Sequence, residues 1–198
     1  MSKRKLNKGI IMILLGIVVI AIPFVMRVMD EKRSQDYIAR FEEDKHHEDE
    51  KEKDSSHKKK KDALFNEENV IGIIEIPSID LKYPIFEGDG NDQLNNGIGH
   101  LTDSAALLEK GNCLLAGHNG SRRGIFFTNL NTIEEKAEVI ITTKDDQTRT
   151  YEVVETRIVG PYNAAIREQT LDETLTLFTC AYHGTQRFVV ICKVKSNQ

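Results

Sequence analysis

The sequence contains little cysteine. Its 198 residues include three cysteines, Cys113, Cys180 and Cys192, which lie far apart in the chain. Three scattered thiols exclude a disulfide framework, and no spacing of cysteine and histidine resembles that of a zinc site. At least one thiol is therefore free or paired between chains.

The chain also lacks an excess of charge of one sign. Its 27 Lys and Arg residues and 31 Asp and Glu residues are mixed along the sequence, and the net charge is -4. The Lys/Arg face with interleaved aromatic residues that indicates nucleic-acid binding is missing. Nucleic acid is thus not an expected partner. The length allows one domain of roughly 100 to 150 residues with additional segments.

One run is long and apolar. Residues 9–26 carry no charge, and as a helix they would extend over about 27 Å, close to the thickness of a bilayer core. The run is longer than the apolar region of a signal peptide, and no small-x-small cleavage site follows it. The sequence therefore predicts an uncleaved transmembrane anchor over residues 9–26.

Basic residues indicate the orientation of this anchor. Lys3, Arg4, Lys5 and Lys8 precede it, and the rest of the chain has no second apolar span. The positive-inside rule leaves residues 1–8 in the cytoplasm and the remaining chain outside the cell membrane. The protein is thus expected to be single-pass, with an extracellular globular domain.

Residues 27–67 form the expected spacer. Residues 42–62 contain no apolar side chain, so they cannot contribute to a core and are either a solvated helix or a disordered stalk. Just before them, residues 37–41 can form one amphipathic turn that lies against the membrane or against the domain. Both alternatives are open for each segment.

From residue 68 to residue 198 the sequence indicates an all-β domain. Short β-rich runs alternate with turn residues, as in a barrel or a sandwich. Short helices are expected near residues 91–96 and 126–133. The candidate strands are 70–76, 81–85, 112–118, 137–143, 149–159, 174–180 and 187–194.

Residues 174–191 carry the clearest chemical pattern. Two β-rich runs are joined by a short polar turn, which places Cys180 and Arg187 at facing strand ends. A thiol beside a fixed cation can be held as thiolate, and the guanidinium can donate to an oxyanion. The alternative for Cys180 is a buried cysteine that ends a core strand. Cys113 and Cys192 alternate with apolar residues inside strands and are interpreted as core residues.

A histidine completes a couple for acyl transfer. His118 ends the candidate strand 112–118 and is followed by turn residues, so it is expected at a sheet rim too. A thiol nucleophile needs a proton acceptor, and a leaving amine needs a proton. The competing histidines are His100, expected in a loop, and His183, whose turn position favours a rim or substrate contact.

These residues resemble the active-site signature of the sortases, the cysteine transpeptidases of Gram-positive cell surfaces. The resemblance rests on TLFTC at 176–180 followed by Arg187, on Gly117-His118, on GIIEIP at 72–77 and on FFTNL at 126–130. It implies a closed eight-stranded β-barrel with short helices. It also implies that Cys180 is the nucleophile, His118 the general acid and base, and Arg187 the stabiliser of the oxyanion or substrate. The residues themselves indicate no calcium site, and neither a cofactor nor a metal is expected.

The resemblance further implies a substrate and an acceptor. The thiolate would attack the Thr carbonyl of an LPxTG-like sorting signal. The resulting thioacyl-enzyme would pass the surface protein to an amine, such as a lipid-linked cell-wall precursor or a pilin. Thr179, Tyr182 and His183 are the expected substrate contacts.

Departures from the family pattern leave the subclass open. Residues 62–65, DALF, lack the proline of the Asp-Pro-aromatic lid of pilus-type sortases, so a typical pilus-type enzyme is not expected. Asp89 and Asp92 are interpreted as ordinary loop residues rather than metal ligands. Two other functions are an inactive sortase-like binding module and a thiol protease that hydrolyses the same signal.

Overall fold

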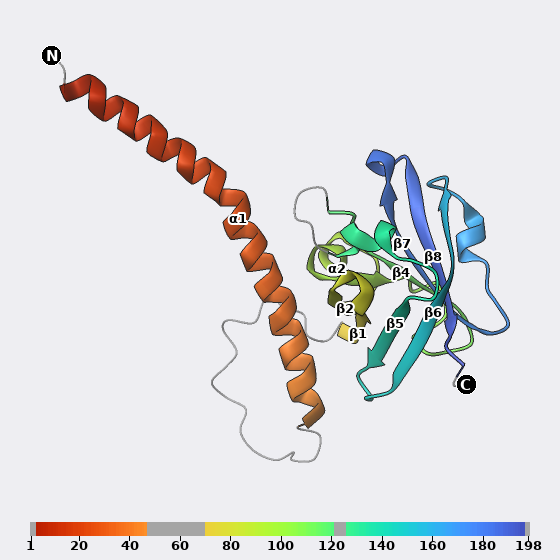
Figure 1. The fold of residues 1–198 in the computed structure, drawn as a ribbon. Coiled ribbons are helices and arrows are strands. Elements are labelled where there is room, and N and C mark those ends of the chain that lie inside the picture. The colour runs from red at the N-terminus through yellow and green to blue at the C-terminus, as the bar shows by residue number, and fades with distance from the viewer. Residues whose placement is uncertain (1–2, 47–69, 121–125, 197–198) are drawn as a thin grey trace.

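Eight strands close into a barrel in the order β1-β2-β3-β4-β7-β8-β6-β5 (Figure 1). This computed structural model describes residues 3–46, 70–120 and 126–196. Closure leaves no unpaired strand edge, and it confirms the predicted closed eight-stranded barrel with short helices. The strands are β1 (Val70–Ile76), β2 (Leu81–Glu87), β3 (Ile98–His100), β4 (Gly111–Ala116), β5 (Glu138–Thr143), β6 (Thr148–Val159), β7 (Glu173–Ala181) and β8 (Gln186–Val194).

The strands bury apolar side chains on both faces near β4 and β7. Side chains alternate between the two faces of a strand, so Leu175 and Leu177 of β7 enter the main core inside the barrel. Phe178 of β7 and Leu114 of β4 belong to a second cluster, which is completed by Ile166 from outside the sheet. The segment between β6 and β7 therefore covers the outer face of the barrel at this point.

Two strands that are distant in sequence, β4 and β7, are paired in the barrel. β4 pairs with β7 in parallel, with Cys113 opposite Leu175 and Ala116 opposite Phe178. β7 then pairs with β8 as an antiparallel hairpin. The chain therefore leaves β4 and β7 at the same end of the barrel, which is also where β8 begins.

Short helices connect the strands. They are the α-helix α2 (Asn91–Asn96) and the 3₁₀-helices η2 (Pro77–Ile79), η3 (Phe127–Thr132), η4 (Ala164–Arg167) and η5 (Tyr182–Gly184). The two helices predicted from the sequence correspond to α2 and η3. The prediction of a loop at His100 is wrong, because His100 ends the short strand β3 and is 4% exposed. Three residues are too few to show an alternating pattern.

A long helix, α1 (Lys3–His46), precedes the barrel and contacts it near its C-terminal end (Figure 1). Its Tyr37, Ile38 and Phe41 are buried with Val70, Ile73 and Phe86. The rings of Tyr37 and Phe86 meet edge to face at 5.2 Å. The sequence allowed residues 37–41 to lie against the membrane or against the domain. In the structure they lie against the domain.

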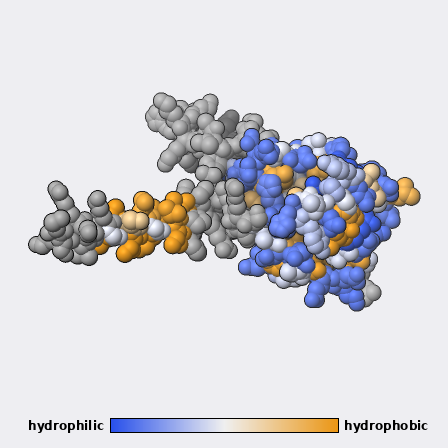
Figure 2. Space-filling model, turned by 90° about the horizontal axis from the view of Figure 1, so that it is seen from above, coloured by the Kyte–Doolittle hydropathy of each residue, from blue (hydrophilic) through white to orange (hydrophobic). Residues whose placement is uncertain are grey.

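The first half of α1 extends away from the barrel and exposes apolar side chains, seen as the orange arm in Figure 2. In the described part of the chain, no helix combines the length and hydropathy needed to cross a bilayer. The predicted transmembrane helix is therefore not confirmed. Residues 47–62 of the predicted spacer and the DALF segment lie outside the described residues.

Candidate active site

A groove of about 500 Å³ lies where β4 and β7 end and β8 begins. Strand ends, α2 and the segment between β6 and β7 all contribute to it. Its lining residues are Asp89, Leu94, Ala116, Gly117, His118, Pro161, Tyr162, Asn163, Ala164, Ile166, Arg167, Phe178, Thr179, Cys180 and Arg187. The three residues predicted to carry catalysis, Cys180, His118 and Arg187, therefore line one groove.

The strand register places His118 beside Cys180. Ala116 lies opposite Phe178 in the parallel β4–β7 pair, and the ladder continues where Gly117 N–H donates to the Phe178 carbonyl over 3.2 Å. Two residues further along each chain are His118 and Cys180. Neighbouring strands lie about 4.8 Å apart, so the imidazole and the thiol start from adjacent backbone positions.

Two side-chain bonds hold these chain ends together. The hydroxyl of Thr179 donates to the Gly117 carbonyl over 2.7 Å, and the side-chain amide of Asn119 donates to the Cys180 carbonyl over 2.8 Å. Thr179 is buried, so its hydroxyl is used within the protein even though the residue lines the groove. Its visible role is to join β4 to β7.

Cys180 and Arg187 face each other across the β7–β8 hairpin, as the sequence predicts. The turn between them contains three successive residues with positive φ, Tyr182 at 47°, His183 at 56° and Gly184 at 88°. A positive φ costs a non-glycine residue about 1 to 2 kcal/mol, so the turn is strained. Nη1 of Arg187 donates to the carbonyls of Gly184 and Gln186, each over 3.0 Å, and thereby supports the turn.

The three cysteines have different environments. Cys180 is exposed in the groove, whereas Cys113 and Cys192 are buried in the core, as predicted. Burial, assisted by Glu87 and Glu173, raises the pKa of the Cys113 thiol to about 12, and burial also raises the pKa of Cys192. A buried, protonated thiol is a poor nucleophile, so Cys180 is the cysteine suited to covalent chemistry.

The other predicted substrate contacts lie outside the groove. Tyr182 and His183 are exposed on η5 and are not among its lining residues. The groove instead has an apolar floor of Leu94, Ala116, Ile166 and Phe178, and Asp89 also lines it. Sequence reasoning missed the wall at residues 161–167. Its signal was the Gly-Pro-Tyr-Asn run that separates β6 from β7.

Nothing in the described residues provides a metal centre, since no group of three or more His, Cys, Asp or Glu side chains is placed to bind an ion there.

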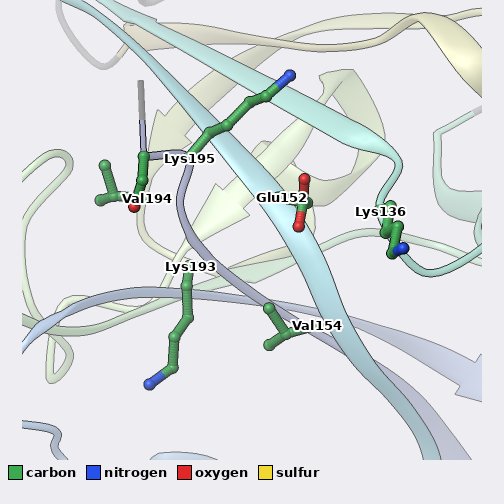
Figure 3. A pocket seen from close by; sticks show the side chains of 7 residues that line it. Lys136, Glu152, Val154, Lys193, Val194 and Lys195 are labelled. Carbon is green, nitrogen blue, oxygen red and sulfur yellow. The ribbon is translucent and has the colours of Figure 1, made fainter. Parts of the chain in front are cut away.

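A second pocket, of about 800 Å³, lies at the other end of β8 (Figure 3). Its lining includes Lys136, Lys193 and Lys195 around Glu152. The amino groups of Lys193 and Lys195 point away from each other in Figure 3, and Lys195 forms an ion pair with Glu138. The lysines therefore do not converge on one ligand, and this pocket contains neither a thiol nor an imidazole.

Comparison with known proteins agrees with this geometry. Residues 74–195 match the model of the sortase domain. Sortase A of Staphylococcus aureus is 28% identical over 176 residues, which cover 87% of this chain and 84% of the relative. Sortase D of Bacillus subtilis is 34% identical over 150 residues, covering 68% of this chain and 69% of the relative.

A solved structure shares the fold. The Sortase D5 transpeptidase of Clostridium perfringens superposes with a TM-score of 0.62 at 29% identity, and the match covers 84% of this chain and 98% of that structure.

Proposed function

Because this chain belongs to the sortase family, whose members are cysteine transpeptidases, we propose that it cleaves an LPxTG-like sorting signal and joins the surface protein to an amine. The observation that carries the proposal is the meeting of Cys180, His118 and Arg187 in one groove, with Cys180 exposed and Cys113 and Cys192 buried. Each of the three is the residue type that thiol-based acyl transfer needs.

In the first step, His118 takes the proton of the Cys180 thiol, and the thiolate attacks the carbonyl carbon of the signal's threonine. Arg187 faces this thiol, and two N–H groups of its Nη1 support the turn. The remaining guanidinium N–H groups donate to the oxyanion. When the C–N bond to glycine breaks, His118 protonates the leaving amine and a thioester remains.

In the second step, an acceptor amine attacks the thioester. A new amide bond forms, the C–S bond breaks, and His118 takes the proton that the amine loses. The acceptor is an amine of a lipid-linked cell-wall precursor or a pilin lysine. The apolar floor of the groove suits the leucine and proline of the signal, because it removes aliphatic surface from water.

The test is a peptide library presented to the full chain with and without an added amine, with products detected by mass. We expect an LPxTG-like peptide to be cleaved after threonine and joined to the amine. Cys180→Ala should abolish both products. Full turnover in that variant would contradict the mechanism, and hydrolysis that ignores added amine would instead favour a thiol protease.

We also propose that residues 9–26 attach the enzyme to the cell membrane, with the N-terminus cytoplasmic and the barrel extracellular. The support is the exposure of apolar side chains along α1, which reaches 74% at Met12. Protease treatment of intact cells should digest the barrel but spare an N-terminal tag. Protection of the barrel would overturn this orientation.

A further inference from the structure

One wall of the groove has little regular structure of its own. It is the segment of residues 160–172, which joins β6 to β7 and contributes six lining residues, 161–164, 166 and 167. The segment contains a single short 3₁₀-helix, η4. Its position must therefore be set by contacts from the rest of the protein, because it has no strand ladder to hold it.

Asn112, near the start of β4, makes the central contact with this wall. Its side-chain amide is buried and donates to the carbonyls of Ile166 and Glu168, each over 3.0 Å. Its side-chain oxygen accepts from the Thr176 hydroxyl over 2.7 Å. Both amide hydrogens are thus used on the wall, while the oxygen fixes the orientation of the group on β7.

The backbone of Asn112 adds two further bonds. Its N–H donates to Oε1 of Gln169 over 3.0 Å, and its carbonyl accepts from Nε2 of Gln169 over 3.5 Å. A side chain at neighbouring Gly111 would lie 2.8 Å from the same Gln169 oxygen, and φ there is +114°. Glycine at this position therefore permits the close approach of the wall.

An ion pair also joins the wall to the rest of the protein. Nη1 of Arg167 donates to Asp103 over 2.7 Å, but the two side chains are 51% and 68% exposed. Exposed pairs of this kind contribute little. The buried amide of Asn112 is thus the stronger of the two attachments, because its partners lose their hydrogen bonds away from water if it is removed.

We propose that Asn112 is a positioning residue for peptide binding, which holds the η4 wall at the distance from the β4 and β7 strand ends that a peptide requires. The inference rests on the proposed function. β4 thereby has two tasks, since it places the wall through Asn112 and leads to His118 at its other end. Thr179 and Asn119 hold the reacting groups through separate bonds, so wall and chemistry can be altered independently.

The test is Asn112→Ala in the full chain, measured for KM and kcat with the cleaved peptide and for alkylation of Cys180 by iodoacetamide. We expect KM to rise about tenfold, because misplaced binding groups weaken recognition. The alkylation rate should stay within about twofold of wild type. A KM within twofold of wild type in the folded variant would overturn the proposal, as would alkylation that falls in parallel with kcat/KM.

A matched control separates positioning from general loss of stability. Val139→Ala changes a buried side chain on β5 that belongs to the main core of the barrel and not to the cluster that contains Ile166 of the wall, so it should leave KM unchanged. If Asn112→Ala does not fold, Gln169→Ala removes the two bonds that an exposed side chain of the same wall makes with the Asn112 backbone, and it should raise KM about threefold. An unchanged KM in Gln169→Ala would then overturn the proposal.

Hydrogen exchange keeps this inference distinct from the proposed function. In Asn112→Ala, the amides of residues 164–169 should exchange at least about tenfold faster than in wild type, but not in Val139→Ala. Unchanged exchange would overturn the role of Asn112. If wild type cleaves no peptide, the proposed function fails, and the exchange rates alone decide whether Asn112 positions the wall.

Discussion

The interior of the barrel and its rim contain the same residue types in different environments. Cys113, Leu175 and Cys192 lie side by side in one layer of the core, on β4, β7 and β8. Cys180 lies five residues beyond Leu175 on the same strand β7, where it is exposed. Side chains alternate between the two faces of a strand, so residues five positions apart lie on opposite faces. Cys180 therefore differs from Leu175 in two ways, because it lies near the end of β7 and on the other face of the sheet.

This difference shows that the reactivity of a cysteine thiol in this barrel depends on its position along the strand. In the interior, loss of hydration keeps a thiol protonated and inert. At the rim, near the ends of β4 and β7, Cys180 lies in the groove together with His118. Its thiol can there contact both the imidazole and a peptide from solvent. The predictions below test this contrast between interior and rim.

The largest effect is expected from removing the rim thiol. Cys180→Ala should lower kcat by a factor of at least about 10⁴, because no other group can form the thioester. Cys113→Ala and Cys192→Ala should each keep activity within about threefold per folded molecule, since they alter packing only. The measurement is peptide turnover at equal concentrations of folded protein. A large loss of kcat in either core variant would contradict the contrast.

The next effect compares two histidines. His118→Ala should lower kcat by about 10² to 10⁴, the usual contribution of a general acid and base, without loss of stability. His100 is buried, with Nδ1 3.2 Å from the Glu87 carboxylate and Nε2 2.9 Å from the Ala105 carbonyl. His100→Ala should instead lower the free energy of unfolding by about 2 to 4 kcal/mol.

Urea unfolding and peptide turnover, measured on both histidine variants, separate the two roles. Equal loss of kcat in the two variants at matched folded fraction would show that His100 takes part in the reaction.

The two buried thiols, Cys113 and Cys192, should lower the free energy of unfolding at alkaline pH. Thiols in the unfolded chain ionise from an ordinary pKa of 9.0, whereas folding raises the pKa of Cys113 to about 12. Between pH 9 and about 12 the folded state therefore binds more protons than the unfolded state. The thiol's contribution to the free energy of unfolding is fully present below pH 9 and decreases as the pH rises above it. Each thiol should contribute a decrease of about 1.4 kcal/mol per pH unit, a tenfold change in the unfolding equilibrium.

The variant with both Cys113→Ala and Cys192→Ala is the control for this pH dependence. Its free energy of unfolding, measured by denaturant titration between pH 9 and 11, should decrease less steeply than that of wild type. An equal slope would show that these thiols do not carry the effect.

The smallest effect on catalysis is expected far from the rim. Tyr37→Ala should loosen α1 from β1 and β2, because Tyr37 packs edge to face on Phe86. Hydrogen exchange in residues 35–42 should increase, while kcat/KM for a short peptide changes by less than about twofold. A large decrease in kcat/KM would show that the helix and the groove are coupled.

Much of the barrel could be predicted from the sequence, because alternating β-branched and apolar residues report which face of a strand is buried. The strand predicted at 112–118 corresponds to β4, which ends two residues earlier than expected. The short strand β3 has too few residues for such a pattern. The position of the Cys180–Arg187 hairpin followed from two neighbouring runs and a short turn, which are local features.

The sequence by itself thus determined the strands, the hairpin that sets Cys180 against Arg187, and the types of side chain available for acyl transfer. Only the tertiary structure decided that β4 runs parallel to β7, because that pairing joins strands that are separated in the sequence by β5 and β6 and leaves no local signal. This pairing places His118 beside Cys180. It also brings Asn112 against the η4 wall, a contact across more than 50 residues that no periodicity in the sequence reports.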